Sequence, residues 1–429
     1  MADPCIPGYP STYYAATAER PSPWAALRGR TRADVCVVGA GIAGCSAALT
    51  LAQRGYRVVL LEAQRVGWGA SGRSGGQAIH GLAVEQDELE KQVGPADALR
   101  IWRLSIEALA LLRQRIATHH IACDWTDGHM YVAIKPRQWR ALQAWHAQLA
   151  GRYAYASTRL LERAELSALL ATARYRGALY DTNSGHLHPL RYTLGLARAA
   201  SAAGVQIHEA SEVQAYTHTA GGLEVRTSSG VVGCSQLLFA GNAWLGATVP
   251  ALARKLMTIA SYIIATEPLG QERAQQLIAN HAAVCDTNWI LDYFRRSSDH
   301  RLLFGGRVNY SGINLRTIAP MTRRRMLAVF PQLSGTRIDY AWGCLIDITR
   351  NRAPHFGRLE PNVYFLQGFS GHGLALAGIA GELVAEAIAG TAERFDLFAR
   401  LTHRDFPGGP LRRPLLALAM LWYRLRDLL

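Results

Sequence analysis

The first residues whose types and spacing could do chemistry are three glycines and an acid near the start of the chain. Gly39, Gly41 and Gly44 form the pattern G-x-G-x-x-G, and Glu62 follows at the end of the same unit. In a dinucleotide site the first glycine permits a tight turn, the second lets a pyrophosphate approach the backbone, and the third lets a helix pack on a strand. The helix then points the positive end of its dipole at the phosphates. Glu62 is placed to accept a hydrogen bond from a ribose 2′-hydroxyl, which favours FAD or NAD over NADP.

The residues around these glycines predict the elements that must position them. Residues 35–38 are apolar and predict a buried parallel strand, residues 42–54 predict a helix, and residues 56–61 predict a second strand that ends at Glu62. A glycine-rich turn in an unrelated α/β domain could show the same spacing. The complete strand, helix and strand are the context that the motif requires, so we favour a dinucleotide site.

A second glycine-rich stretch follows directly after the second predicted strand. Residues 69–77 read G-A-S-G-R-S-G-G-Q. A domain that binds only a nicotinamide dinucleotide has no evident need for this stretch. A flavoprotein does need it, because the isoalloxazine ring lies against closely approaching backbone. The two stretches together therefore favour FAD.

With both stretches in view, the chain resembles the FAD-dependent amine and amino-acid oxidoreductases of the D-amino-acid oxidase superfamily. Residues 69–77 are similar to the γ-glutamylputrescine oxidoreductase family, and the resemblance continues at residues 293–295, 303–307, 342–349 and 367–373. It covers nearly the whole chain. It implies an α/β fold class, with a Rossmann-like FAD-binding domain interleaved with an α+β substrate domain built on a large antiparallel sheet.

The resemblance and the sequence pattern also imply how the chain is divided. We expect residues 1–33 to form an arm that packs on the surface or on another subunit. The FAD-binding domain is expected at residues 34–84, 157–250 and 342–400, and the substrate domain at 85–156 and 251–341. Residues 401–429 predict a basic helical tail. We favour packing of this tail on protein over peripheral contact with a membrane, because a short amphipathic helix suits either surface.

The motif and the resemblance together imply which residues contact FAD. By resemblance, Val213 contacts the adenine through its backbone, and the turn after the strand 237–239 covers the pyrophosphate. The helix that follows the last glycine-rich loop can stabilise negative charge on the reduced ring through its N-terminus. The predicted FAD contacts are Gly39, Gly41, Ile42, Ala43, Gly44, Glu62, Ala63, Ala70, Ser71, Gly72, Arg73, Gly75, Gly76, Gln77, Val213, Ala240, Gly241, Gly368, Gly371, His372, Gly373 and Leu374.

The flavin would perform the redox step, so the protein supplies position and electrostatics. His372 and Arg73 are the candidate catalytic residues. The alternative for His372 is a structural role in its loop. Arg73 could face the flavin or the substrate, with a phosphate contact or a structural salt bridge as the alternative, and we favour contact with cofactor or loop backbone. Some relatives attach FAD through a cysteine near Cys344, but Cys344 does not align squarely with that position. We therefore expect non-covalent FAD.

The substrate is expected to be a primary or secondary amine. Any carboxylate that it carries is expected to bind away from the flavin. Sarcosine oxidases carry a lysine where this chain has Ala375, and glycine and D-amino-acid oxidases carry an arginine where it has Leu374. That lysine or arginine would hold the substrate carboxylate, and this chain has neither. Arg295 and Arg307 are the candidates to receive a distal carboxylate such as a γ-glutamyl group. Tyr293 is a candidate wall of the pocket, with a core position as the alternative.

The composition excludes several other classes of function. The net charge is +14, from 46 basic and 32 acidic residues, but the arginines are scattered and form no nucleic-acid patch. The seven cysteines show no CxxC or CxxH spacing, so we expect no metal and no disulfide framework. We find no signal peptide and no apolar run of membrane-spanning length, and therefore expect a cytoplasmic location.

These observations predict an FAD-dependent oxidoreductase that acts on the C–N bond of a γ-glutamylputrescine-like amine. Hydride transfer to flavin N5 would give an imine, which hydrolyses to an aldehyde and ammonia, while O2 is reduced to H2O2. One alternative is an amine or amino-acid dehydrogenase that passes electrons to quinone. Another is an FAD-binding protein without turnover, although both predicted flavin loops are intact.

Overall fold

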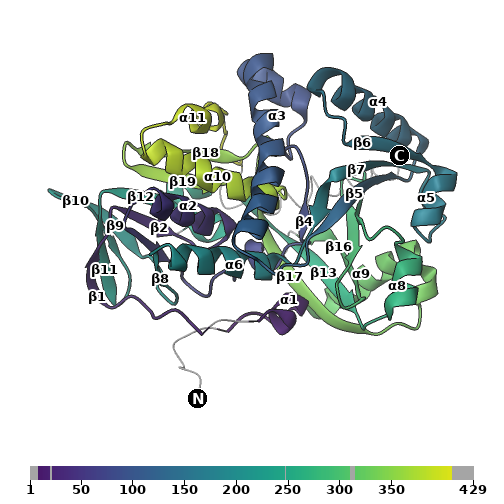
Figure 1. The fold of residues 1–429 in the computed structure, drawn as a ribbon, viewed down its shortest axis with the longest axis horizontal. Helices are drawn as coiled ribbons and strands as arrows, with labels where there is room; N and C mark the ends of the chain where they lie inside the picture. The colour runs from purple at the N-terminus through teal and green to yellow at the C-terminus, as the bar shows by residue number, and fades with distance from the viewer. Residues whose placement is uncertain (1–7, 20–21, 247, 310–314, 408–429) are drawn as a thin grey trace.

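Three β-sheets and the helices packed on them make up the fold in the computed structural model, which describes residues 8–19, 22–246, 248–309 and 315–407 (Figure 1). The six-stranded sheet and the four-stranded sheet lie on one side of the long helix α3 (Gln86–Thr118). The nine-stranded sheet lies on its other side. The site depends on how the first and the last of these sheets meet.

The six-stranded sheet contains the strands predicted around the first glycine motif. Its order is β18-β19-β12-β2-β3-β8, and all neighbours are parallel except β18 and β19. The strands are β2 (Val35–Val38), β3 (Val58–Leu61), β8 (Gln206–His208), β12 (Gln236–Phe239), β18 (His355–Glu360) and β19 (Val363–Gln367). Every residue of β2 and β3 is buried, because both faces of the sheet are covered.

Different layers cover the two faces of this sheet. Val35 and Val37 point into the core shared with α2 (Ile42–Gln53), α6 (Pro189–Ala202) and α10 (Gly373–Ile388). Cys36 and Val38 point to the opposite face, where the four-stranded sheet packs. That sheet contains β1 (Gly29–Arg32), β9 (Ala215–Thr219), β10 (Gly222–Arg226) and β11 (Gly230–Cys234) in the order β1-β11-β10-β9. The alternation along β2 follows the period of two that a strand imposes.

Helices α2 and α10 lie backbone to backbone. A Cβ atom added at Gly381 of α10 would lie 2.6 Å from the carbonyl oxygen of Ala43 and 2.6 Å from the amide nitrogen of Ala47, both in α2. Helix α2 follows β2 and helix α10 follows β19, and these strands run in the same direction. Both helices therefore begin at the carboxyl edge of the sheet, where open α/β sheets bind ligands.

The nine-stranded sheet forms the other wall of the site. Its order is β17-β13-β16-β15-β14-β5-β7-β4, with β6 also paired to β7, and only β14 and β5 are parallel among its described pairs. The strands are β4 (Gln77–Ala78), β5 (Thr126–Ala133), β6 (Thr158–Glu162), β7 (Gly177–His186), β13 (Leu256–Thr266), β14 (Ala283–Asp286), β15 (Asp292–Arg296), β16 (Leu302–Asn309) and β17 (Ile338–Thr349). The helices α4 (Pro136–Tyr153), α5 (Arg163–Leu169), α8 (Gln271–Leu277) and α9 (Leu315–Val329) accompany it.

The sheet pairing corrects three of the expected domain boundaries. Residues 157–188 were expected in the FAD-binding domain, but β6 and β7 pair with each other and with β5 in the nine-stranded sheet. Strand β17, expected at the start of the last FAD-binding segment, pairs along β13. Strand β4 also joins the large sheet through β7. A single strand shows its buried face in the sequence but not the sheet that it joins, so the pattern alone could not place these segments.

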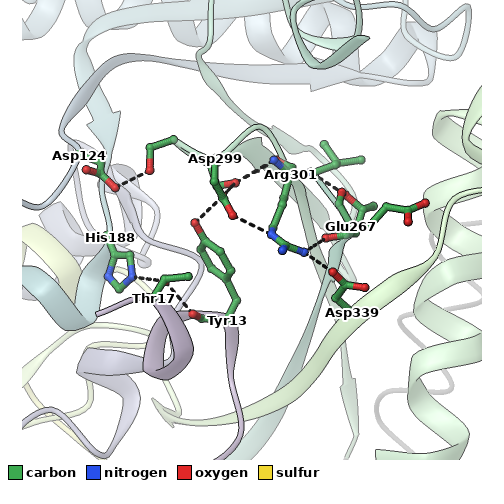
Figure 2. Close-up of polar contacts among 12 residues, drawn as sticks. Tyr13, Thr17, Asp124, His188, Glu267, Asp299, Arg301 and Asp339 are labelled. Carbon is green, nitrogen blue, oxygen red and sulfur yellow. Dashed lines mark hydrogen bonds and ion pairs between the residues drawn. The ribbon is translucent and has the colours of Figure 1, made fainter. Parts of the chain in front are cut away.

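The N-terminal arm packs on this chain rather than standing apart from it. Helix α1 (Tyr13–Thr17) buries Tyr13 and Tyr14. Figure 2 shows the Tyr13 hydroxyl donating to Asp299, at 2.7 Å, while Arg301 binds both Asp299, at 2.7 Å, and Asp339, at 2.6 Å. The arm therefore closes over the hairpin of β15 and β16. Residues 408–429 of the predicted tail lie outside the described residues.

Within the described residues, no single helix has both the length and the apolar character needed to cross a membrane. Helix α10 and helix α11 (Glu393–Ala399) meet that criterion only as a pair, and this pair is bent by 117°.

The contact between α2 and α10 gives a first testable prediction. We expect Gly381→Ala to lower the free energy of unfolding by roughly 1–3 kcal/mol, because the added methyl group meets backbone that cannot move aside. Gly151→Ala is the matched control, because Gly151 lies in α4 with no atom near its missing Cβ. That control should raise stability by about 0.5–1 kcal/mol through helix propensity. Urea unfolding measures both, and equal midpoints for the two variants would contradict the packing described.

Candidate active site

A cavity of about 1070 Å³ runs from the first glycine turn to the face of the nine-stranded sheet. One end is lined by residues of the glycine-rich turns at Gly39 and Gly371. At its other end the lining comes from the large sheet and from helices α3 and α4, with His80, Trp102, Tyr131 and Trp145. The cavity therefore joins residues expected in the FAD-binding domain, such as Gly39, to residues expected in the substrate domain, such as Trp102.

The first glycine turn leaves no space for side chains. Gly39 has a φ of +105°, and a Cβ there would lie 2.9 Å from the backbone of Ala240. A Cβ at Gly41 would lie 2.8 Å from the Ser71 hydroxyl oxygen. A Cβ at Gly44 would overlap the carbonyl oxygen of Gly39. The first two glycines line the cavity, whereas Gly44 sets the close packing of α2 on β2, as the motif predicts.

Glu62 lies where the motif places it, directly after β3 and on the wall of the cavity. Its carboxylate oxygens accept hydrogen bonds from the amide nitrogen of Ala40, at 2.8 Å, and of Gln64, at 2.9 Å. Burial raises the pKa of Glu62 to about 7. The two backbone bonds fix the carboxyl group toward the cavity, where a ribose hydroxyl can donate to it.

Two helix N-termini open into the same cavity. Helix α2 starts after Gly41 and helix α10 after His372, and neither cap residue makes a side-chain capping bond. The Ile42 amide nitrogen donates to the Ser71 hydroxyl, at 3.0 Å, which ties the start of α2 to the second glycine-rich stretch. Because a helix N-terminus carries partial positive charge, this end of the cavity favours an anionic ligand.

Comparison with known proteins identifies that ligand. Residues 34–387 match the family model described as FAD dependent oxidoreductase. This chain belongs to that family. Among the relatives of this FAD-dependent oxidoreductase, a probable oxidoreductase (OrdL) of Haemophilus influenzae is 43% identical over 89% of each chain. Gamma-glutamylputrescine oxidoreductase of Escherichia coli K12 is 40% identical over 97% of this chain and 98% of its own.

A solved structure agrees with the fold. Glycine oxidase from Bacillus cereus has a TM-score of 0.71 over 87% of this chain and 99% of its own, with 21% sequence identity. The predicted fold class is therefore confirmed, with an FAD-binding part interleaved with a substrate part on a large sheet. Among the described residues, no three His, Cys, Asp or Glu side chains are grouped to hold a metal ion.

Most of the residues predicted to contact FAD line the cavity of this oxidoreductase. They are Gly39, Gly41, Ile42, Ala43, Glu62, Ala63, Ala70, Ser71, Gly75, Gly76, Gln77, Val213, Ala240, Gly241, Gly371, His372, Gly373 and Leu374. The glycine cradle, the open helix N-termini and the Glu62 carboxyl fit a dinucleotide. We infer that these residues hold FAD, which supplies the hydride acceptor when bound.

Four predicted contacts do not line the cavity, and the structure gives a different reason for each glycine among them. A Cβ at Gly72 would overlap the carbonyl oxygen of Gly67. Gly368 has a φ of +71° and donates its amide hydrogen to Asn242, at 3.0 Å. Gly44 packs α2 on β2. These glycines allow close backbone packing behind the cavity lining, and their contact with FAD stays a prediction.

Arg73 is the fourth of these residues, and its catalytic role stays a prediction. Its guanidinium lies over the Trp68 ring at 4.5 Å, and its Nε donates to the carbonyl oxygen of Gly69, at 3.3 Å. Its own carbonyl oxygen accepts from the Trp342 indole, at 3.0 Å. Burial lowers the pKa of Arg73. These contacts agree with the favoured interpretation, contact with cofactor or loop backbone, and the buried Nη2 atom has no hydrogen-bond partner among the described residues.

His372 lies at the cavity wall, immediately before α10. Burial lowers its pKa to about 4, so its imidazole is neutral near pH 7. Its Nδ1 atom has no hydrogen-bond partner within the part of the chain that the structure describes. A neutral imidazole with a free nitrogen is compatible with contact to the flavin, and that role stays a prediction.

The structure places Arg295, a candidate to receive a substrate carboxylate, away from the cavity. Its side chain is only 4% exposed and does not line the cavity. It donates to the carbonyl oxygens of Gly75, at 2.8 Å, and Leu187, at 2.9 Å, and to the Tyr14 hydroxyl, at 3.0 Å. Arg295 therefore holds the second glycine-rich stretch from behind and links it to the N-terminal arm.

The other two substrate candidates have different outcomes. Tyr293 lines the cavity, its hydroxyl lies 3.1 Å from the Ser261 hydroxyl, and its ring would lie 2.7 Å from a Cβ at Gly75. It therefore forms a wall of the pocket next to the predicted flavin loop, although its role toward a substrate stays a prediction. Arg307 falls on β16, but its side chain lies outside the described residues.

Several residues that line the cavity were not predicted from the sequence. His80, Trp102, Tyr131 and Trp145 come from separate elements, and no spacing in the sequence connects them. Asp347 also lines the cavity, and its carboxylate accepts a hydrogen bond from the Thr258 hydroxyl, at 2.8 Å. Burial raises the pKa of Asp347 to about 7. An acid inside the apolar run 344–348 was the signal that could have revealed it.

The position of Arg295 gives a second prediction. Arg295→Ala removes the donor for three carbonyl oxygens and one hydroxyl, so we expect the free energy of unfolding to fall by roughly 2–4 kcal/mol and FAD to be lost. Arg159→Ala is the matched control, because Arg159 pairs with Glu165 at the exposed surface, and it should change stability by about 0.5 kcal/mol or less. Thermal melts and flavin absorbance report both. If Arg295→Ala kept wild-type stability but bound amine more weakly, a role in substrate binding would be restored.

Proposed function

We propose that this chain oxidises a γ-glutamylputrescine-like amine. The amine nitrogen gives up a proton and its neighbouring carbon gives up a hydride, which leaves an imine. Water then converts the imine to an aldehyde and ammonia. FAD would accept the hydride at N5 and return the two electrons to O2, giving H2O2.

The observation that carries this proposal is the single cavity that joins the FAD cradle to an aromatic compartment. Gly39 and Glu62 lie at one end, and Trp102, Tyr131 and Trp145 lie at the other. An alkyl amine can therefore reach the cofactor with its chain between aromatic side chains. The relative from Escherichia coli K12, named for γ-glutamylputrescine, covers 97% of the chain and supports this substrate class.

The apolar start of helix α10 supports an amine rather than a small α-amino acid. Leu374 lines the cavity and Ala375 is 3% exposed, so neither position presents a cation beside the flavin loop. A carboxylate beside these two side chains would find no cation on them, and a buried charge without a partner is costly. A substrate that carries its carboxylate several bonds away from the reacting nitrogen avoids this cost.

The third prediction concerns the reaction itself. Without oxygen, γ-glutamylputrescine should bleach the flavin absorbance at lower concentration and at a higher rate than putrescine, sarcosine, glycine or D-alanine. When air is admitted, O2 uptake and H2O2 should accompany amine loss in equal amounts. Failure of every amine to bleach the flavin would contradict the proposal. Turnover with a redox dye but not with O2 would contradict the oxidase part alone.

The fourth prediction concerns attachment of FAD. Cys344 lines the cavity, but burial raises its pKa to about 11, so the thiol stays protonated and is a poor nucleophile near pH 7. We therefore propose that FAD is bound without a covalent link. Acid precipitation should leave all the flavin in the supernatant, in wild type and in Cys344→Ser alike. Flavin that stays with the wild-type pellet and leaves the Cys344→Ser pellet would contradict this.

A further inference from the structure

His80 occupies a built site at the substrate end of the cavity. It follows β4, lines the cavity and is 2% exposed. Its Nδ1 atom lies 2.7 Å from a carboxylate oxygen of Asp181, which is fully buried on β7. Asp181 also accepts from the Tyr155 hydroxyl, at 2.8 Å, and from the amide nitrogens of Asn183, at 3.0 Å, and Ser184, at 3.1 Å. These bonds fix the carboxylate and, through it, the imidazole.

The partners of Asp181 also fix the tautomer of His80. Burial opposes ionisation of Asp181, but its hydrogen bonds, that of His80 foremost, outweigh burial and lower its pKa to about 2. An ionised carboxylate only accepts, so the Nδ1 atom of His80 must carry the proton. The Nε2 atom is then the ring nitrogen left for another partner. Among the described residues, that atom has no hydrogen-bond partner.

Aromatic rings enclose this imidazole. The ring centroids of Trp102, Tyr131, Trp145 and Tyr155 lie 5.5, 6.1, 5.6 and 5.0 Å from that of His80. The first three of these residues also line the cavity. Because the faces of aromatic rings attract cations, this compartment suits an ammonium group better than an anion.

The remaining titratable groups around His80 are neutral at pH 7. Burial lowers the pKa of His129 to about 3 and that of His372 to about 4, and His80 adds to both shifts. Burial also raises the pKa of the Tyr131 and Tyr155 hydroxyls. Of these described neighbours, Asp181 alone carries a charge at neutral pH, and that charge is negative.

We propose that this compartment receives the amine of the substrate and that His80 accepts the proton that the ammonium must lose before oxidation. This inference rests on the proposed function. One N–H bond of the ammonium breaks, its electron pair stays on the amine nitrogen, and a new N–H bond forms at Nε2 of His80. Asp181 stabilises the resulting imidazolium through the Nδ1–H bond. The freed electron pair on nitrogen is what allows the neighbouring carbon to release a hydride, and His80 returns its proton to solvent once product has left.

The test is the pH dependence of flavin bleaching by γ-glutamylputrescine without oxygen, in wild type and His80→Gln. Glutamine keeps hydrogen-bonding groups but accepts no proton. We expect the limiting rate at pH 7 to fall about 10²-fold, as for loss of a general base. It should recover as the pH approaches about 10, where the free amine loses its proton unaided. Equal losses at every pH would mean a structural role and would overturn the proposal.

Two further variants keep this result interpretable. Asp181→Asn preserves shape but removes the charge that stabilises the imidazolium, so its rate should shift with pH in the same direction as that of His80→Gln. His146→Gln is the matched control, because His146 bonds to Thr158, at 3.0 Å, and does not line the cavity. Its profile should follow wild type. If Asp181→Asn also follows wild type, the proposal is wrong even where His80→Gln fails to fold.

A binding measurement separates this inference from the proposed function. tert-Butylamine has no hydrogen on the carbon next to nitrogen, so it binds without being oxidised, and the fluorescence of Trp102 and Trp145 should report its binding to the compartment. We expect His80→Gln to weaken binding at pH 7 about tenfold, the effect of one charge-assisted hydrogen bond. If no amine bleaches the wild-type flavin, the proposed function fails, and His80-dependent binding alone then supports the amine compartment. Binding that is unaffected by His80→Gln would overturn the inference that His80 receives the amine.

Discussion

The close approach of backbone to backbone around Gly39 is the constraint on which the rest of the structure depends. The turn contacts Ala240, α2 packs against it through Gly44, and α10 packs on α2 through Gly381. Side chains at these points would meet backbone atoms, which cannot rotate away. As a result β2, α2 and α10 form one rigid unit, and two helix N-termini are held at one edge of the sheet. The field that favours an anionic cofactor therefore follows from packing rather than from a charged side chain.

The second glycine-rich stretch has close backbone packing at Gly72 and also depends on contacts from distant parts of the chain. Arg295 donates to the carbonyl oxygens of Gly75 and Leu187 and to the hydroxyl of Tyr14 in the arm. Burial, reinforced by Arg295, holds the pKa of neighbouring His186 well below its usual range, so the arginine meets a neutral acceptor. A guanidinium used in this way is a structural cation, since its donors match carbonyl oxygens. The flavin loop thus depends on the N-terminal arm, which joins the start of the chain to the site.

Local pattern was enough to predict the cofactor end of the site and not enough for the substrate end. The elements around Gly39, the position of Glu62 and the helix after His372 follow from residues adjacent in sequence. Strands β6, β7 and β17 were not predicted as strands, and the sheet that they join could not be predicted because pairing is a long-range property. Arg295 looked like a binding residue for the same reason, since its carbonyl partners are far away in the chain. His80 gave no signal, because its partner Asp181 is on another strand.

The charges along the cavity explain why its two ends suit two different steps. Helix N-termini favour negative charge at the FAD end, whereas the ionised Asp181 favours positive charge at the aromatic end. Burial also raises the pKa of Asp347 to about 7 and lowers that of His372 to about 4, so at neutral pH His372 is neutral and Asp347 is partly ionised. Arg352 lines the same cavity. An ammonium is attracted to the aromatic end, but oxidation needs the free electron pair of the neutral amine. A proton acceptor at that end, paired with a buried carboxylate, resolves this conflict within one cavity. The ammonium is attracted as a cation, and its proton then passes to the imidazole before the hydride leaves.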